Sequence, residues 1–399
     1  MNLVVALDFR FVLTPDGRVW TRTTYPRAFW ERYLNVFDRV KIVARAEKRL
    51  RVDEGYKQVT GASVDFAPVP YYLGPWQYLK TRQKVRAAVW SAAGTEDAVL
   101  CRVSSQIASD LLPELWAQDR PYGLEVVGDP YEAFAPGAVR HPLRPYLRRR
   151  ATRILQEQCA RAAAVSYVTE RALQRRYPCE QSYAVSDVDL QVTSFRAVPR
   201  NFVDAVPKRL LFVGSLEQMY KGQDTLLHAV AELRESMQLE LRIVGSGRHR
   251  AELEQLASSL GLRGCVHFTG ELPASAICSE LDNATLFVLP SRTEGLPRVI
   301  VEAMARALPC IATNVGGIPE LLAPEDMAVP NDAQALAAKM KEILSDSARL
   351  NRMSERNLEK AQQFRPEILE RRRTEFYSFL RHATQEWHAA KTTEEVCVA

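Results

Sequence analysis

Three charged side chains in the second half of the chain have types suited to ligand chemistry: Lys221, Glu294 and Glu302. Glu302 follows Glu294 eight positions later, and ionised carboxylates are hydrogen-bond acceptors that suit pairs of donating hydroxyls. A lysine in a Lys-Gly loop is a point charge that suits phosphate oxygens. The ordinary alternatives are a solvated turn for Lys221 and a helix-start acid for Glu294. Glu302 falls in the middle of a predicted helix, which the second alternative does not explain.

The stretch 286–320 must position both carboxylates. It is predicted to contain a short buried strand at 286–289, a loop, a helix from Arg298 to about Ala307 and a second strand at 310–313. Pro297 suits the first turn of that helix, and we interpret Gly316-Gly317 as a structural turn after the second strand. Loops that follow parallel strands meet at one sheet edge, where ligands of doubly wound folds bind. We therefore expect the loop and the helix start to lie there together.

The rest of the chain alternates short apolar runs with amphipathic segments, a βα rhythm that predicts mostly parallel sheets. Strands are predicted near 3–7, 40–44, 98–103, 122–127, 164–168, 209–213, 239–244 and 266–268. Helices are predicted near 26–37, 150–163, 224–233, 248–260, 273–283, 333–345, 349–364 and 366–382. Asp16-Gly17 between two apolar runs predicts a β-hairpin, because glycine supplies the positive φ of the turn.

A chain of 399 residues is too long for one ordinary core and predicts two domains. Residues 196–208 hold two prolines and show little periodicity, so we expect a linker there. The predicted domains are residues 1–200 and 201–365. A C-terminal helix follows over 366–399, with a crossing back to the first domain as one interpretation, and we expect a frayed tail at about 391–399.

Targeting signals and the pattern of cysteines indicate which cellular compartment to expect. No run approaches the roughly 18 apolar residues of a membrane span, and the start MNLVVALDFR lacks the basic flank of a signal peptide. The seven cysteines include no CxxC pair, and Cys397 is third from the end, which does not fit prenylation. We therefore expect a cytoplasmic protein.

The net charge of +5 hides an asymmetry, because residues 1–200 carry +9 and the remainder −4. Within the basic half, residues 71–90 mix tyrosines and tryptophans with four cations, and residues 140–153 contain a cluster of arginines. This pattern suits a peripheral helix at the inner face of an anionic membrane, or a helix whose aromatic face is core, and both interpretations stay open. No nucleic-acid-binding motif accompanies the charge, so nucleic acid is not an expected partner.

Four blocks in the second half resemble, in order, those of glycosyltransferase family 4: FVGSLEQMYKGQDTLLHAVAEL, RIVGSGRHRAEL, HFTGEL and PSRTEGLPRVIVEAMARALPCIATNVGGIPE. The similarity covers about residues 208–322, and ordered blocks are far more specific than the two glutamates alone. It implies the GT-B fold, an α/β architecture of two Rossmann-like domains whose parallel sheets face a cleft. In this family the C-terminal domain holds a nucleotide-sugar and the N-terminal domain holds the acceptor.

The resemblance assigns roles to the charged residues. Lys221 matches the lysine that binds the donor diphosphate, and Glu294 matches the carboxylate that faces the sugar ring, so these are the predicted catalytic residues. Glu302 matches the carboxylate that binds the ribose hydroxyls. Gly245 and Gly247 would let the backbone approach the nucleotide, although strand-ending glycines occur in any βα fold. The full predicted donor site is Gly214, Ser215, Lys221, Gly245, Gly247, Glu294, Gly295, Leu296, Pro297, Arg298 and Glu302.

The chain departs from the family pattern at two points. The family often has an arginine after the strand-ending glycine, where this chain has Ser215, so Arg298 or backbone N–H groups must meet part of the phosphate charge. The family's histidine in the first domain has no equivalent here. Asp129 is the acceptor-side candidate, with an ordinary turn aspartate before a proline as the alternative. Asp187-x-Asp189 resembles a DxD metal motif, but the GT-B resemblance implies no need for a metal, so we expect neither metal nor cofactor.

Together these features predict a retaining glycosyltransferase of polysaccharide biosynthesis. It would move a hexose-type sugar from a nucleotide diphosphate-sugar, of the UDP type, to a hydroxyl of a glycan, lipid-linked or small-molecule acceptor. A glycosidase is not favoured, because the surroundings of the two glutamates are of the phosphate-binding kind. The alternatives are a GT-B epimerase of UDP-sugars, whose acidic and histidine catalysts we do not locate, and a non-catalytic nucleotide-sugar-binding partner, which Ser215 suggests.

Overall fold

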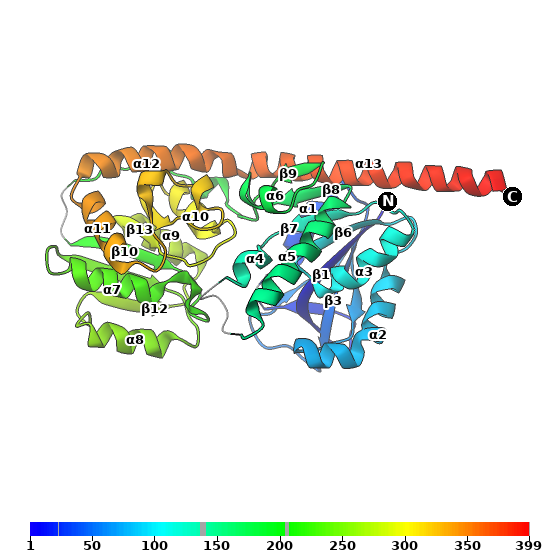
Figure 1. Ribbon diagram of the computed structural model, residues 1–399, viewed down its shortest axis with the longest axis horizontal. Helices are drawn as coiled ribbons and strands as arrows, with labels where there is room; N and C mark the ends of the chain where they lie inside the picture. The colour runs from blue at the N-terminus through cyan, green and yellow to red at the C-terminus, as the bar shows by residue number, and fades with distance from the viewer. Residues whose placement is uncertain (23, 136–140, 204–206, 399) are drawn as a thin grey trace. The chain divides into compact units, whose positions relative to one another are not determined.

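The computed structural model describes residues 1–22, 24–135, 141–203 and 207–398, which form two compact units (Figure 1). Unit 1 consists of Met1–Gly128, Thr152–Val185 and Glu370–Ala399, and unit 2 consists of Asp129–Ala151 and Ser186–Leu369. The predicted linker, 196–208, lies outside the described residues at 204–206. Each unit is thus assembled from segments that are separated in the sequence, whereas the predicted domains were the continuous ranges 1–200 and 201–365. Packing between segments, and not their order along the chain, decides which unit a segment belongs to.

In its described residues, unit 1 holds a mostly parallel sheet of nine strands. The strands are β1 (Leu3–Leu13), β2 (Val19–Thr21), β3 (Val40–Lys48), β4 (Lys57–Gln58), β5 (Val64–Val69), β6 (Ala98–Val103), β7 (Gly123–Val126), β8 (Ala164–Tyr167) and β9 (Ser182–Ala184). The helices are α1 (Arg27–Leu34), α2 (Gly74–Ala92), α3 (Gln106–Ala117), the second half of α5 (Arg144–Ala160), α6 (Ala172–Arg176) and most of α13 (Pro366–Val398). Parallel pairs run through β5-β3-β1-β6-β7-β8-β9, and β2 and β4 extend the sheet from β1 in antiparallel pairs.

Local sequence signals predict several elements of unit 1 closely. The hairpin expected around Asp16-Gly17 is confirmed, since Val12 pairs with Trp20 across antiparallel β1 and β2, and Gly17 has a φ of +78°. The strand predicted at 98–103 is β6 with the same bounds. Helix α3 is an element that the sequence patterns did not predict, and it contains Pro113.

In its described residues, unit 2 holds a parallel sheet of six strands. They are β10 (Lys208–Val213), β11 (Leu239–Val244), β12 (Val266–Gly270), β13 (Leu286–Leu289), β14 (Cys310–Thr313) and β15 (Met327–Ala328). The helices are α4 (Pro130–Ala133), the first half of α5 (Arg144–Ala160), α7 (Gln223–Leu233), α8 (Arg250–Ser259), α9 (Ala274–Asn283), α10 (Arg298–Ala305), α11 (Ala333–Leu344) and α12 (Ser347–Ala361). The strand order β12-β11-β10-β13-β14-β15 changes direction between β10 and β13, and ligands of doubly wound folds bind at the carboxyl ends of strands at such a switch point.

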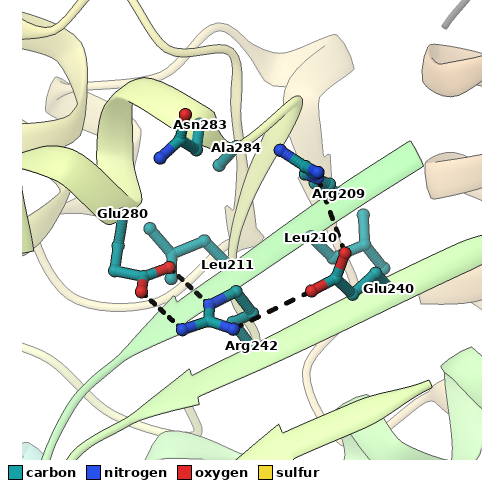
Figure 2. Close-up of a pocket in the computed structure, with 8 residues that line it drawn as sticks. All are labelled: Arg209, Leu210, Leu211, Glu240, Arg242, Glu280, Asn283 and Ala284. Carbon is teal, nitrogen blue, oxygen red and sulfur yellow. Dashed lines mark hydrogen bonds and ion pairs between the residues drawn. The ribbon is translucent and has the colours of Figure 1, made fainter. Parts of the chain in front are cut away.

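The starting halves of β10 and β11 carry a charged hollow of about 220 Å³ that α9 also lines (Figure 2). Arg242 donates to both oxygens of Glu280, at 2.5 and 2.6 Å. Glu240 lies 3.5 Å from Arg209 and 3.8 Å from Arg242. These four charges cancel, and the hollow lies at the opposite ends of the strands from the switch-point loops, so we do not assign the site here.

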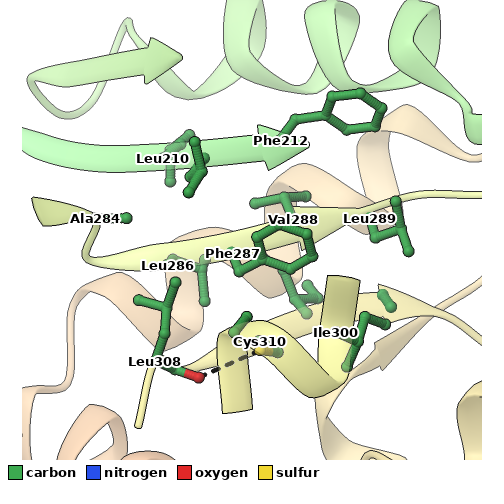
Figure 3. Close-up of a cluster of buried hydrophobic side chains, with 14 of the residues drawn as sticks. Leu210, Phe212, Ala284, Leu286, Phe287, Val288, Leu289, Ile300, Leu308 and Cys310 are labelled. Carbon is green, nitrogen blue, oxygen red and sulfur yellow. Dashed lines mark hydrogen bonds between the residues drawn. The ribbon is translucent and has the colours of Figure 1, made fainter. Parts of the chain in front are cut away.

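Strand β13, which leads to the loop of Glu294, is buried at every residue, as its continuous apolar run predicts. Its side chains belong to the core of unit 2 together with Phe212 of β10 and Ile300 of α10 (Figure 3). Beside them, Cys310 donates to the Leu308 carbonyl at 3.2 Å. The loop after β13 therefore starts from a close-packed support, which a site of defined geometry needs.

The C-terminal helix α13 belongs to unit 1 from Glu370 on, and part of it packs into the core of that unit. Phe376, Tyr377 and Leu380 are buried there. The Tyr377 hydroxyl donates at 2.9 Å to the carboxylate of Glu125, a buried residue of β7. The helix is thus fastened by apolar packing and by a buried hydrogen bond.

Helix α13 is longer than the predicted 366–382. It continues to Val398, so the frayed tail expected over 391–399 is helical up to that residue. Once a helix is nucleated, each further residue adds a backbone hydrogen bond, which allows it to extend past its last packed turn. No helix in the described part of the chain is both long and apolar enough to cross a membrane.

Candidate active site

The loop after β10 carries Lys221 across the switch point to the loop after β13. Lys221 ends a 3₁₀ turn, and the next residue, Gly222, has the left-handed φ of +72°. A Cβ on Gly222 would lie 2.0 Å from the carbonyl oxygen of Pro290, so only glycine lets the two loops touch here. The Lys-Gly sequence therefore does more than form a turn, because it brings the lysine to the neighbouring loop.

Lys221 and Glu294 form an ion pair at the switch point. Lys221 Nζ lies 2.8 Å from Glu294 Oε1, and the Ser291 hydroxyl donates to the same oxygen at 2.7 Å. The two side chains are only 14% and 9% exposed. Burial by itself lowers the pKa of Lys221, but Glu294 and Tyr220 outweigh it, and the pKa is raised above its ordinary value. The amine therefore stays protonated at neutral pH.

Arg292 is a site residue that the sequence reasoning missed. Its guanidinium binds both oxygens of Asp224, at 2.9 and 2.7 Å, and the carbonyl of Met219. Its backbone N–H donates to the carbonyl of Tyr220 at 2.6 Å. Arg292 therefore ties the loop after β13 to the loop after β10. The signal was an arginine within the SRTEG segment, but its partner Asp224 is 68 positions away, and no local pattern reveals that pairing.

Gly245 and Gly247, which follow β11, support the loop after β10 through backbone contact. A Cβ on Gly245 would lie 2.0 Å from the carbonyl oxygen of Gly214, and one on Gly247 would lie 2.1 Å from the nitrogen of Glu217. Gly214 in turn packs against Lys221, whose Cδ would lie 2.8 Å from an added Cβ. These contacts favour the packing interpretation of both glycines, and their contact with a nucleotide stays a prediction.

Gly316 contacts the loop of Glu294 from the side of β14. It has a φ of +55°, and a Cβ there would lie 1.9 Å from the Glu294 carbonyl oxygen. The Gly317 N–H also donates to the carbonyl of Gly295 at 2.7 Å. The Gly316-Gly317 turn is therefore structural, as we interpreted it, and it also fixes the position of the backbone that carries Glu294.

Gly316→Ala is expected to lower kcat/KM about a hundredfold, because the new methyl group must displace the backbone that carries Glu294 by roughly an ångström. Gly264→Ala is the matched control, since its Cβ meets nothing within 4 Å and its φ lies outside the left-handed region. Steady-state kinetics and thermal unfolding of both purified variants measure the effect. Equal activity of the two variants would show that the position of this loop does not matter for transfer.

Glu302 lies in the middle of α10 with a half-buried carboxylate. Burial raises its pKa, and the positive charge of Arg298 one turn earlier offsets only part of that shift. The carboxylate forms no hydrogen bond or ion pair with the residues that the structure describes. Since partly burying a charge without a partner costs free energy, this is the behaviour expected of a group that accepts hydrogen bonds from a ligand.

The start of α10 offers backbone donors close to Glu294. Pro297 is the N-cap and contributes no capping side chain. The first N–H groups of the helix are thus suited to an anion, helped by the helix dipole. Leu296 packs against the core of unit 2, and Arg298 is exposed.

Ser215 supplies no positive charge at the position where the family often has an arginine, so the predicted phosphate site lacks one cation. Its exposed hydroxyl accepts from the Glu217 N–H at 3.2 Å, and its carbonyl accepts from the buried Gln223 at 3.0 Å. Arg292 is committed to Asp224 and cannot replace the missing cation without losing that contact. A diphosphate bound here would therefore depend on Lys221, and the predicted contribution of Arg298 or of backbone N–H groups stays a prediction.

A pocket of about 230 Å³ opens beside Glu294 within unit 2. It is lined by Asp129, Glu132, Ala133, Gln218, Tyr220, Thr293, Glu294 and Gly295. Three of these residues are acids, which suits donating hydroxyls better than phosphates. Asp129 caps α4 by accepting from the Tyr131 N–H at 2.9 Å, which is the ordinary turn role, so its acceptor-side role stays a prediction.

The DxD-like pair Asp187 and Asp189 lies between β9 and β10, and Asp189 is exposed. Among the residues that the structure describes, no three or more His, Cys, Asp or Glu side chains are grouped to hold a metal ion. The interpretation of the pair as structural stays a prediction.

Solved structures similar to this chain include glycosyltransferases of the GT-B class. Sucrose-phosphate synthase of Thermosynechococcus elongatus matches with a TM-score of 0.69 and 19% identity over 96% of this chain and 100% of that chain. HepE of Anabaena, in complex with UDP, matches with a TM-score of 0.64 and 16% identity over 98% and 100%. At these identities the likeness concerns the fold. The chain is a GT-B protein, and the fold class predicted from the sequence is confirmed.

The sequence comparisons find glycosyltransferases that are similar to this chain. Residues 198–360 match the glycosyl transferases group 1 family. Protein CapJ of Staphylococcus aureus is 27% identical over 347 residues, which are 84% of each chain. The putative colanic acid biosynthesis glycosyltransferase WcaL of Escherichia coli is 32% identical over 170 residues, 40% of this chain and 41% of that one. These matches indicate a glycosyltransferase, and they confirm the predicted resemblance to family 4.

Proposed function

We propose that this enzyme is a retaining glycosyltransferase that moves a hexose-type sugar from a nucleotide diphosphate-sugar, of the UDP type, to a hydroxyl of a glycan or lipid-linked acceptor. The observation that carries the proposal is the Lys221–Glu294 ion pair, 2.8 Å long, across the switch point of unit 2. A doubly wound sheet binds nucleotides at this position. The half-buried carboxylate of Glu302, which has no partner among the residues that the structure describes, supports the same assignment.

A protonated lysine held by a carboxylate suits a departing diphosphate. In the donor-free protein Glu294 neutralises Lys221, and a bound diphosphate would bring more negative charge to the amine than one carboxylate does. Negative charge increases on the leaving group as the sugar–phosphate bond breaks, so the interaction with Lys221 is strongest in the transition state. Glu294, released from the amine, would accept hydrogen bonds from the hydroxyls of the sugar.

The proposed reaction is a front-face substitution at the anomeric carbon. The acceptor oxygen forms a bond to that carbon on the side from which the diphosphate leaves, and the bond from carbon to phosphate oxygen breaks with its electron pair. The acceptor proton passes to the departing phosphate oxygen, so no protein base is required. The configuration at the anomeric carbon is kept, while Lys221 and the first N–H groups of α10 stabilise the leaving group.

Similar proteins suggest which donors and acceptors to test first. The HepE structures hold UDP and UDP-glucose. A relative in Mycolicibacterium smegmatis, 34% identical over 140 residues, is a GDP-mannose-dependent phosphatidylinositol monomannoside mannosyltransferase. The amylovoran biosynthesis glycosyltransferase AmsK of Erwinia amylovora is 37% identical over 147 residues. These names support a nucleotide-sugar donor and a glycan or lipid-linked acceptor.

We also infer that the reaction needs no metal ion and takes place in the cytoplasm. The proposed leaving-group contacts are a lysine and backbone N–H groups, which can meet phosphate charge without a metal. Six of the seven cysteines (Cys101, Cys159, Cys179, Cys265, Cys278 and Cys310) are free thiols, which suits a reducing compartment. Unchanged transfer rates in the presence of a chelator would support the first inference.

A thermal-shift panel of UDP-, GDP- and ADP-sugars, followed by hydrolysis assays with the best ligand, tests the proposal. One nucleotide class should raise the Tm, and hydrolysis should release its nucleoside diphosphate together with a sugar of unchanged anomeric configuration, detected by NMR. Conversion into a different nucleotide-sugar without acceptor would indicate the epimerase instead. Binding without release of the diphosphate, under any acceptor tested, would indicate a non-catalytic partner.

A further inference from the structure

Helix α2 exposes apolar side chains on the outer face of unit 1. Trp76 is 78% exposed and Leu79 is 58% exposed, and the N-cap residue Leu73 is exposed as well. Single exposed apolar residues are ordinary, but these three lie within two turns of one another. At about 100° per residue, the outer side of the helix forms one uncharged stripe of Trp76, Leu79, Gln83, Ala87 and Trp90.

Cations border this stripe on both sides. On the same helical projection Lys80 and Lys84 lie on one side, and Arg82 and Arg86 lie on the other. Lys80, Arg82 and Lys84 are exposed. No acidic residue occurs in the sequence from position 66 to position 95, so α2 itself carries no negative charge. Asp110 of the neighbouring α3 interacts with Arg82 and Arg86, which leaves Lys80 and Lys84 as the cations that it does not offset.

The opposite face of α2 is packed into unit 1. Its buried residues are Val85, Val89 and Ala92. The Tyr78 hydroxyl donates to the carboxylate of Asp110 on α3 at 2.8 Å, and Tyr72 is buried. The aromatic residues of 71–90 are therefore divided between two environments. The core interpretation of this segment accounts for the tyrosines and leaves Trp76 unexplained.

We propose that the outer face of α2 binds an anionic lipid surface, with Trp76 and Leu79 inserted at headgroup level and the flanking lysines against lipid phosphates. Charge complementarity selects this occupant, because the surface is negative at the headgroups and apolar beneath them, as the stripe and its borders require. A nucleic acid would match the cations and offer no apolar layer for the exposed indole and leucine. The inference does not depend on the proposed donor chemistry, since α2 contributes no residue to the candidate active site.

Flotation of the full-length protein with vesicles tests this surface. The protein should float with vesicles that contain phosphatidylglycerol, remain in solution with pure phosphatidylcholine vesicles, and be released by high salt. Lys80→Ala together with Lys84→Ala should lower the partition coefficient about 30-fold, at about 1 kcal/mol per lysine. Trp76→Ala should lower it roughly tenfold, because it removes a large apolar side chain. All substituted side chains are exposed, and circular dichroism confirms that the variants are folded.

Two matched controls test whether the loss of binding is specific to α2 or follows from removing any exposed cations or any exposed apolar side chain. Arg149→Ala with Arg150→Ala removes the same charge from exposed positions of α5, and Leu50→Ala removes a leucine that is 89% exposed elsewhere in unit 1. Both controls should bind vesicles like the unmodified protein. Equal losses in the controls and in the α2 variants would overturn the proposal, as would flotation with neutral vesicles alone, or binding of nucleic acid without any binding of lipid.

Discussion

Lys221→Ala is expected to lower kcat/KM about 100- to 1,000-fold, because the variant loses the one side-chain cation that meets the leaving diphosphate in the proposed mechanism. The loss should fall mainly on kcat, since the charge that the lysine stabilises develops as the sugar–phosphate bond breaks. Single-turnover kinetics with the donor identified by the thermal-shift panel measures the chemical step directly. A near-normal rate would refute the mechanism.

A structural effect of Lys221→Ala must be separated from a catalytic one, because the substitution also leaves Glu294 without its ion-pair partner. Unfolding curves measure the stability loss, and Glu294→Gln should cost a similar amount, since it breaks the same pair. Lys341→Ala, at an exposed lysine in the last turn of α11, is the matched control and should leave the rate unchanged. A rate that falls only in proportion to the unfolded fraction would indicate a purely structural lysine.

Glu302→Gln is expected to weaken donor binding about 10- to 100-fold while raising the Tm of the donor-free protein. The first effect is the loss of charge-assisted hydrogen bonds from the ribose hydroxyls. The second follows because the ionised carboxylate is half-buried with no partner in the described part of the chain, and the neutral amide reduces the free-energy cost of that burial. Glu355→Gln, at an exposed glutamate of α12, should change neither quantity. Isothermal titration calorimetry and thermal unfolding measure the two effects, and unchanged donor affinity would place Glu302 outside the site.

The pH dependence of Glu302 has a definite sign. Burial raises its pKa in the folded state above the ordinary value of 4.5, so folding favours the protonated form. Its contribution to stability is therefore most favourable at low pH and is lost as the pH rises through the folded pKa. Donor affinity should show the opposite trend, falling as the pH is lowered through that pKa, and the fall should be absent in Glu302→Gln. The same calorimetric titration, repeated over a pH series, checks this.

Much of the fold could be predicted from the sequence, because the buried strands read as continuous apolar runs. The strands at 98–103, 286–289 and 310–313 have the predicted bounds. The extent of α13 could not be predicted, because its last turns lack the apolar stripe that marks a packed helix. The sequence also could not predict which segments form each compact unit, since residues 129–151 belong to unit 2 together with residues 186–369.

The sequence predicted the charged residues of the candidate site, but it did not predict which of them contact one another. Lys221 and Glu294 were proposed separately, and the structure joins them directly over 73 positions. Arg292 was missed because its partner Asp224 lies in the first turn of α7, 68 positions earlier in the chain. For Gly316 the sequence indicated a turn, but only the fold shows that a side chain there would meet the Glu294 backbone.

By itself the sequence indicated the class of the protein, most of its strands and helices, and the side chains able to do chemistry, because periodicity and motif spacing are local properties of the chain. The tertiary structure decided which of those side chains meet. It paired Lys221 with Glu294, left Glu302 without a partner among the described residues, and turned Trp76 outward while Tyr78 faces inward. These outcomes depend on which loops converge at the switch point and which helix face meets the sheet, and both are set by strand order and packing between residues far apart in the sequence.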